Sequence, residues 1–170
     1  MTVLERMEDL WQSVIRDHED RDKIDLLFIE NGFPEHTPYR DQPGAEYCGH
    51  TAAHGFRLIL PEDFLHSIFS STTRLNGGGP SPWSAFGIDR NKHNVKDLGD
   101  VQGSDLVVVK TSGKKAWGDH IVIATSGPSS SGQFSTIEGN AFGIRGDGTW
   151  GKGVVKRLRN LKDVRQIYRF

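Results

Sequence analysis

The first sixty residues carry apolar positions at helical spacing. They lie three or four residues apart near the start of the chain, at Leu4, Met7, Leu10, Trp11, Val14 and Ile15. Thr2 and Glu5 have the spacing of a capping box, which predicts that a helix begins here. A second helix is predicted from Lys23 to Glu30, before Asn31-Gly32. A third is predicted from about Glu46 or Tyr47 to Leu60, where Pro61 ends it.

The pattern changes to that of strands after residue 104. Five short apolar runs are separated by Gly, Ser and Lys turns: Leu106–Val109, His120–Ala124, Gln133–Glu138, Gly153–Leu158 and Val164–Tyr168. Residues 143–153 hold five glycines, so we expect a broad loop or hairpin there. Residues 71–104 are rich in Gly, Ser, Asn and charge, and we expect them to form a long surface connection.

Helices followed by strands predict an α+β fold, in which the Cys48 helix packs on an antiparallel sheet of about five strands. The 170 residues show no repeat and no domain boundary. We therefore expect a single domain, 1–170, with a helical N-terminal extension and loop over 1–45 and the core over 46–170.

Composition excludes several classes of function. Lys and Arg total 21 against 22 Asp and Glu, so no strong net charge favours nucleic acid or anionic lipid. No apolar run approaches the ~20 residues of a membrane helix, so we expect no membrane insertion. The first residues lack the pattern of a classical signal peptide, and we expect synthesis in the cytoplasm without one. A single cysteine excludes an internal disulfide.

That cysteine, Cys48, is predicted in the first turn of a helix after a Pro-Gly loop. His120 opens a predicted strand, and Glu138 closes the next one, with Asn140 two residues further on. A nucleophilic thiolate needs a base, and the base needs a third group to hold its ring. Alternation along the strand turns His120, Val122 and Ala124 to one face, which we expect to pack against the Cys48 helix. Glu138 and Asn140 are two residues apart and are expected to share a face, so either could orient the imidazole.

No metal or other cofactor is expected. His50 and His54 are four residues apart, but Thr51 stands where a zinc motif has its glutamate. We therefore expect these histidines on the helix surface or at a pocket rim. Asp41 alone is no calcium site, because calcium takes about 6–8 oxygen ligands.

Four segments together resemble one enzyme family: Ser104–Val109, Gly118–Ile123, Ser135–Asn140 and Gly153–Arg157. They are similar to the CHAP-type amidases, which are cysteine, histidine-dependent amidohydrolases/peptidases with a papain-like core. The resemblance covers roughly residues 40–170, and the run Ile137-Glu138-Gly139-Asn140 is its most specific part. Two positions depart from the family pattern, since Tyr47 replaces a frequent Trp and Ser104 replaces the Gly of a Pro-Gly-Asp run.

The resemblance implies cleavage of an amide bond in peptidoglycan. By position, Cys48 corresponds to the nucleophile, His120 to the base, Glu138 to the orienting residue and Asn140 to an auxiliary polar group. Gln42 has the spacing of an oxyanion-hole glutamine in papain-like proteases. Tyr47 and Trp117 are expected to contact substrate.

Three biological settings fit this chemistry, namely a secreted antibacterial effector, a phage lysin and a wall-remodelling enzyme. We favour the effector, which would act in the periplasm or cell wall of a target bacterium. A cognate immunity protein covering the Cys48 cleft is then an expected partner. Two alternatives stay open: a cysteine protease or deamidase acting on proteins, and an inactive papain-like binding module.

Overall fold

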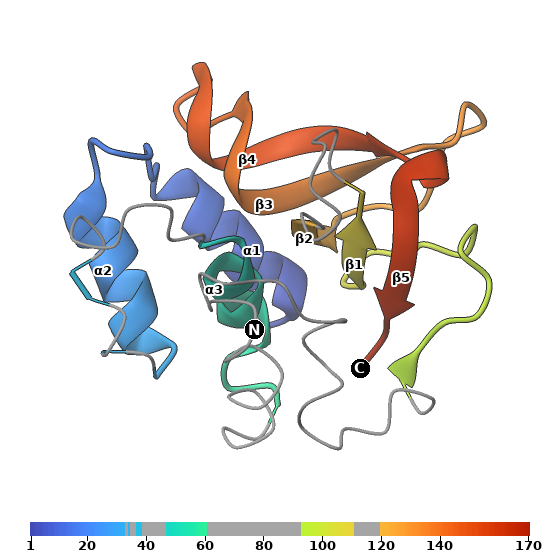
Figure 1. The fold of residues 1–170 in the computed structure, drawn as a ribbon, viewed down its shortest axis with the longest axis horizontal. Helices are drawn as coiled ribbons and strands as arrows, with labels where there is room; N and C mark the ends of the chain where they lie inside the picture. Colours follow the sequence, from blue (N-terminus) through green and yellow to red (C-terminus); the bar gives the residue numbers. More distant parts are fainter. Residues whose placement is uncertain (33, 35–36, 39–46, 61–92, 111–119) are drawn as a thin grey trace.

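A computed structural model describes residues 1–32, 34, 37–38, 47–60, 93–110 and 120–170. The described part is an α+β fold with helices gathered beside one antiparallel sheet (Figure 1). Its helices are α1 (Val3–Gln12), α2 (Arg21–Glu30) and α3 (Cys48–Phe56). Its strands are β1 (Leu106–Val109), β2 (His120–Ala124), β3 (Gln133–Ile144), β4 (Trp150–Asn160) and β5 (Val164–Tyr168).

The sheet has the order β4-β3-β2-β1-β5, and each neighbouring pair is antiparallel. The bounds predicted for β1, β2 and β5 are confirmed. β3 and β4 are longer than predicted, since they continue to Ile144 and start at Trp150. Most of the glycine-rich segment 143–153 is therefore paired strand, with the turn confined to its centre.

The N-terminal helix begins as predicted, with the complete Thr2–Glu5 capping box, but ends earlier, at Gln12. Val14 has a φ of 55°, which takes the backbone out of the helix. The Ile15 carbonyl then accepts the Val154 N–H at 3.0 Å, and the Asp17 N–H donates to the Lys152 carbonyl at 3.1 Å. The segment around Ile15, which was predicted to continue the helix, thus lies along part of the free edge of β4 and protects that edge from pairing with other chains.

α3 is also shorter than predicted. It stops at Phe56, and Leu58 follows with a φ of 68° and an exposed side chain. Residues 61–92, which include most of the predicted surface connection, lie outside the described residues. The connection is described from residue 93, and its Val101 is buried in the core.

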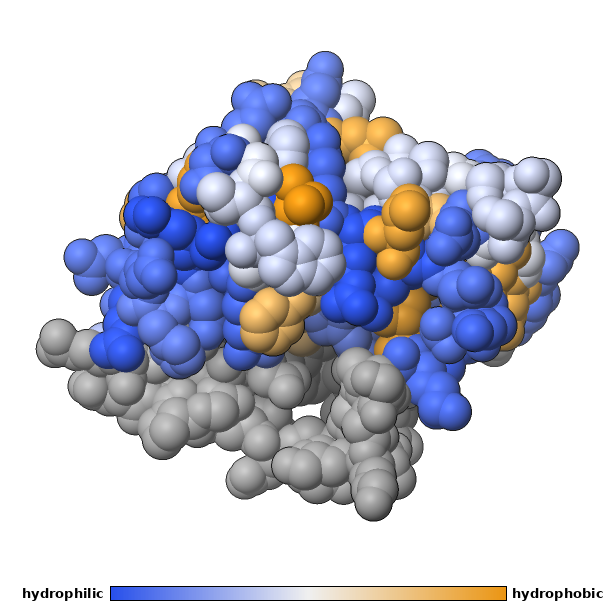
Figure 2. Space-filling model, turned by 90° about the horizontal axis from the view of Figure 1, so that it is seen from above, coloured by the Kyte–Doolittle hydropathy of each residue, from blue (hydrophilic) through white to orange (hydrophobic). Residues whose placement is uncertain are grey.

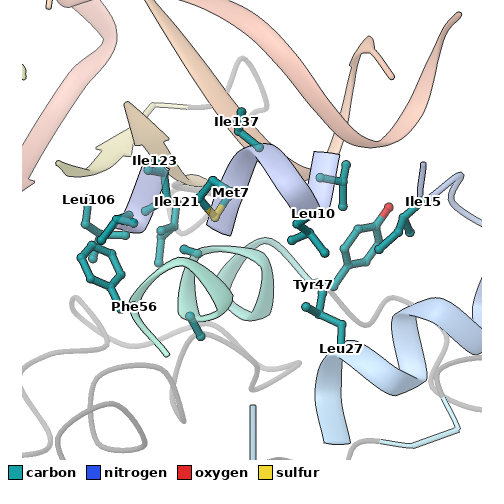
Figure 3. Packing of buried hydrophobic residues seen from close by; sticks show 14 of the residues in the cluster. Met7, Leu10, Ile15, Leu27, Tyr47, Phe56, Leu106, Ile121, Ile123 and Ile137 are labelled. Atoms are coloured by element: carbon teal, nitrogen blue, oxygen red, sulfur yellow. The ribbon is translucent and has the colours of Figure 1, made fainter. Parts of the chain in front are cut away.

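The sheet buries apolar side chains on both faces. On the helix face, Met7 of α1 and Phe56 of α3 pack in one cluster with Ile121, Ile123 and Ile137 of the sheet (Figure 3). On the opposite face a second cluster gathers alternate strand residues and the segments beside them, namely Val101, Val107, Val109, Val122, Ala124, Phe134, Val164 and Ile167. The expectation that Val122 and Ala124 face the Cys48 helix is therefore wrong, because Ile121 and Ile123 occupy that face.

Seen from above, the surface is largely hydrophilic, and its apolar residues form separate patches (Figure 2). Within the described ranges, no helix has the length and apolar composition needed to cross a bilayer.

Gly139 in β3 lies where α3 comes closest to the sheet. A Cβ built on this glycine would be 1.9 Å from the Thr51 Oγ1 and 2.7 Å from the Thr51 Cβ. It would also be 3.1 Å from the Tyr47 ring. Thr51 lies in the first turn of α3, Tyr47 directly precedes the helix, and both are buried. The helix can therefore approach β3 here only because residue 139 has no side chain.

We predict that Gly139→Ala destabilises the protein by about 1–3 kcal/mol, because its methyl group overpacks a filled site and pushes α3 away from β3. Chemical denaturation of the variant and the parent protein measures this difference. Gly99→Ala is the matched control, since the added Cβ would meet only a side-chain oxygen of Asp97, at 3.2 Å. Equal stability of the two variants would contradict this account of the packing.

Candidate active site

Cys48 is the first residue of α3, and its side chain is buried at 4% exposure. The preceding Tyr47 occupies the N-cap position without a side-chain cap. Its hydroxyl donates to Oδ1 of the buried Asp17 at 2.9 Å, and the ring is fully buried in the core. Tyr47 thus anchors the helix start, and this burial corrects the expectation that it contacts substrate.

His120 is the first residue of β2 and is buried. Its Nε2 lies 2.7 Å from Oε2 of Glu138 in β3, and the Cys48 side chain lies close enough to the ring to raise the pKa of His120. Because Nε2 is engaged by the carboxylate, Nδ1 is the nitrogen available for the sulfur. The chain thus brings together a thiol, an imidazole and a carboxylate, as the sequence predicted, from α3, β2 and β3.

The Glu138 carboxylate has no exposed surface and is held by four hydrogen bonds. Its Oε2 accepts from His120 and from the terminal guanidinium nitrogen Nη2 of Arg159. Its Oε1 accepts from the Thr136 hydroxyl at 2.6 Å and from Nε of Arg159 at 3.0 Å. Two bonds to each oxygen use the full acceptor capacity of a carboxylate, which favours its ionised form.

These contacts determine the ionisation of the pair. Burial alone would lower the pKa of His120, but its interactions with Cys48 and Glu138 raise that pKa to about 9. Burial alone would raise the pKa of Glu138, but hydrogen bonds from His120 and Arg159 lower it to about 2. At neutral pH the site therefore holds a protonated imidazole beside an ionised carboxylate.

The same shifts link stability to pH. The pKa of His120 rises on folding, so its contribution is fully present below the ordinary value of 6.5 and is lost as the pH rises through about 9. The pKa of Glu138 falls on folding, so its contribution is present above 4.5 and is lost as the pH falls through about 2.

Asn140 does not share the position of Glu138. It has a φ of 57° and lies in a bulge between Glu138 and Ala141, which interrupts the alternation that was expected to place both residues on one face. Within the described residues, Glu138 is the group bonded to His120 Nε2. The predicted substrate-contacting residues Gln42 and Trp117, like Asp41, lie outside the described residues.

Of the two helix histidines, which were expected on the helix surface or at a pocket rim, His50 is fully buried, with its ring centroid 4.0 Å from that of Phe28. His54 is partly exposed. Burial, together with the charges of Arg6 and Arg57, lowers the pKa of His54 to about 4, so this residue is neutral. In the part of the chain that the structure describes, no three His, Cys, Asp or Glu side chains are grouped to hold a metal ion.

Sequence reasoning missed two partners of Glu138. Thr136 precedes it by two residues in the same strand, so alternation was an available signal for their shared face. Arg159 lay just beyond the strand predicted to end at Leu158. In the structure β4 continues to Asn160, and its Val155 pairs with Glu138. Arg159 lies four residues after Val155, so alternation places its side chain on the same face of the sheet as Glu138.

Comparison of the chain with models of protein families, with curated proteins and with solved structures finds no match. The likeness to CHAP-type amidases rests on the residues quoted above.

We predict that Glu138→Gln and Cys48→Ala each lower the pKa of His120 from about 9, because each removes a negative partner that stabilises the imidazolium. A pH titration of the His120 ring by NMR measures the change. Glu8→Gln is the matched control, since the Glu8 carboxylate pairs with Lys156 at 2.8 Å. An unchanged His120 titration in Cys48→Ala would show that the sulfur is not its neighbour.

Proposed function

We propose that this protein is a cysteine amidohydrolase that cleaves an amide bond of peptidoglycan. The observation that carries the proposal is that His120 interacts with both the Cys48 side chain and the Glu138 carboxylate, to which it is hydrogen-bonded. It has the parts of a thiol-based acyl transfer, namely a nucleophile, a base and a group that orients the base.

In the proposed first half-reaction, Cys48 reacts as the thiolate, and His120 carries the proton that the thiol has given up. The sulfur attacks the amide carbonyl carbon, forming a carbon–sulfur bond and a tetrahedral oxyanion. When the carbon–nitrogen bond breaks, the imidazolium returns its proton to the leaving amine, and a thioester remains on Cys48. Glu138 keeps the ring oriented and stabilises its charged form.

In the second half-reaction, His120 removes a proton from water, and the resulting oxygen nucleophile attacks the thioester. The carbon–sulfur bond breaks, the carboxylic acid leaves, and the proton returns to the sulfur. Both steps pass through an oxyanion, for which the backbone N–H of Cys48 is a suitable donor. This residue begins α3, where backbone N–H groups have no partner within the helix and no N-cap side chain binds them.

The choice of peptidoglycan rests on the CHAP resemblance of residues 40–170, whose catalytic positions coincide with this chain of contacts. The same resemblance supports the role of an antibacterial effector or phage lysin acting in the periplasm or wall of a target cell. It also supports a cognate immunity protein that would bind over Cys48. Proteolysis or deamidation of a protein would use the same three side chains, so the test includes protein substrates.

We predict that the parent protein releases soluble fragments from purified peptidoglycan, and that Cys48→Ala lowers this release to background while keeping the fold, because the small side chain removes only the nucleophile. Mass spectrometry of the fragments identifies the bond that is cut. His18→Ala is the control, since His18 is exposed on the surface.

Three results would contradict the proposed function. Undiminished release by Cys48→Ala would exclude the thiol mechanism. Intact peptidoglycan together with Cys48-dependent cleavage or deamidation of proteins would assign the same chemistry to a different substrate. A folded parent protein with neither activity and a slowly reacting thiol would identify a binding module.

A further inference from the structure

Arg159 of β4 is a further partner of the Glu138 carboxylate in the proposed catalytic site. Its side chain is 14% exposed, and its guanidinium contacts both carboxylate oxygens of Glu138 through two different nitrogens. The two-point contact restricts rotation of the carboxylate, because a planar fork meets a planar acceptor. Glu138 is also the group bonded to His120 Nε2.

We propose that Arg159 is a positioning residue of the active site, which keeps Glu138 ionised and oriented towards His120. This inference rests on the proposed function, because it assigns Arg159 to the same thiol chemistry. Arg159 does not touch the reacting atoms and acts through Glu138.

Arg159 supplies the positive charge that the buried Glu138 requires. Full burial strongly disfavours the ionised form of a carboxyl group unless a cation is close. In the neutral state of the pair, with thiol and unprotonated imidazole, Arg159 is the cation in contact with Glu138. In the ion-pair state, the thiolate and Glu138 carry two negative charges, and His120 and Arg159 carry two positive charges. Arg159 thus makes the buried group neutral overall in both states.

Arg159 also fixes the orientation of the Glu138 carboxylate. His120 and Arg159 Nη2 share Oε2, while Thr136 and Arg159 Nε share Oε1. Without the guanidinium, each oxygen retains one partner, and the carboxylate gains freedom to rotate away from the imidazole. The Thr136 hydroxyl also donates towards the Arg157 carbonyl at 3.2 Å, so it cannot replace the fork.

The groups that act on this buried cluster come from four elements. Across the described residues, the titratable side chains that interact within it are Cys48 on α3, His120 on β2, Glu138 on β3 and Arg159 on β4. Arg159 lowers the pKa of Glu138, so its removal is expected to raise that pKa and to weaken the hold of the carboxylate on the protonated imidazole.

The test follows the pH titration of the Glu138 carboxyl by NMR, together with kcat for peptidoglycan cleavage. For Arg159→Met we expect the midpoint of the Glu138 titration to move up by about one pH unit. For Arg159→Lys, which keeps the charge but loses the fork, we expect a midpoint near that of the parent protein. We expect kcat of Arg159→Lys to fall about tenfold or more, as when the partner of a ligand-orienting group is lost.

Arg157→Gln is the matched control on the same strand, because Arg157 is exposed and donates to the Phe142 carbonyl at 3.2 Å. Its Glu138 midpoint should equal that of the parent protein. An equal shift in Arg157→Gln and Arg159→Met, or no shift in either, would overturn the role of the Arg159 charge. If Arg159→Met does not fold, Arg159→Lys still decides, since full kcat in that variant would overturn the role of the fork.

The two proposals fail in different ways. If the parent protein cleaves peptidoglycan through Cys48 while both Arg159 variants keep its midpoint and kcat, the role of Arg159 is wrong and the proposed function stands. If the Arg159→Met midpoint moves as expected but no peptidoglycan is cleaved, the proposed substrate is wrong and the electrostatic role of Arg159 stands.

Discussion

The buried, ionised carboxylate of Glu138 is the constraint on which the site depends. A charge without solvent contact requires donors around it, and here they come from β2, β3 and β4. Those donors are correctly spaced only when the three strands keep their observed register. The same demand for partners orients His120, because its Nε2 must point at the carboxylate. The need of the Glu138 charge for partners therefore requires both the observed register of the strands and the observed orientation of the His120 ring.

The packing of α3 on the sheet supplies the sulfur. Gly139 lets the start of the helix approach β3 beside Glu138, and Tyr47 holds that end by its bond to the buried Asp17. Cys48 comes next along the chain, so its position follows from contacts on both sides of it. The meeting with His120 occurs where both elements begin, and this explains how the two side chains converge although Val122 and Ala124 face away from the helices.

The sequence predicted the α+β class, all five strands and the convergence of Cys48, His120 and Glu138, because these depend on local periodicity and on residue types with few other uses. It did not predict the true end of α1, since a positive φ at Val14 leaves no mark in an apolar pattern. It wrongly placed Asn140 on the same face as Glu138, because simple alternation does not foresee the bulge between Glu138 and Ala141. Arg159 was missed because its contact with Glu138 depends on the pairing of β3 with β4, and that register emerges only in the folded sheet.

The most direct test of the central claim is the rate at which iodoacetamide alkylates Cys48, measured at one neutral pH in the folded parent protein and in His120→Ala. If His120 is the base of the sulfur, the parent protein reacts about tenfold faster or more, because alkylation requires the thiolate. If the two proteins instead react at the same rate, the sulfur and the imidazole are not coupled, and the account of this site is contradicted.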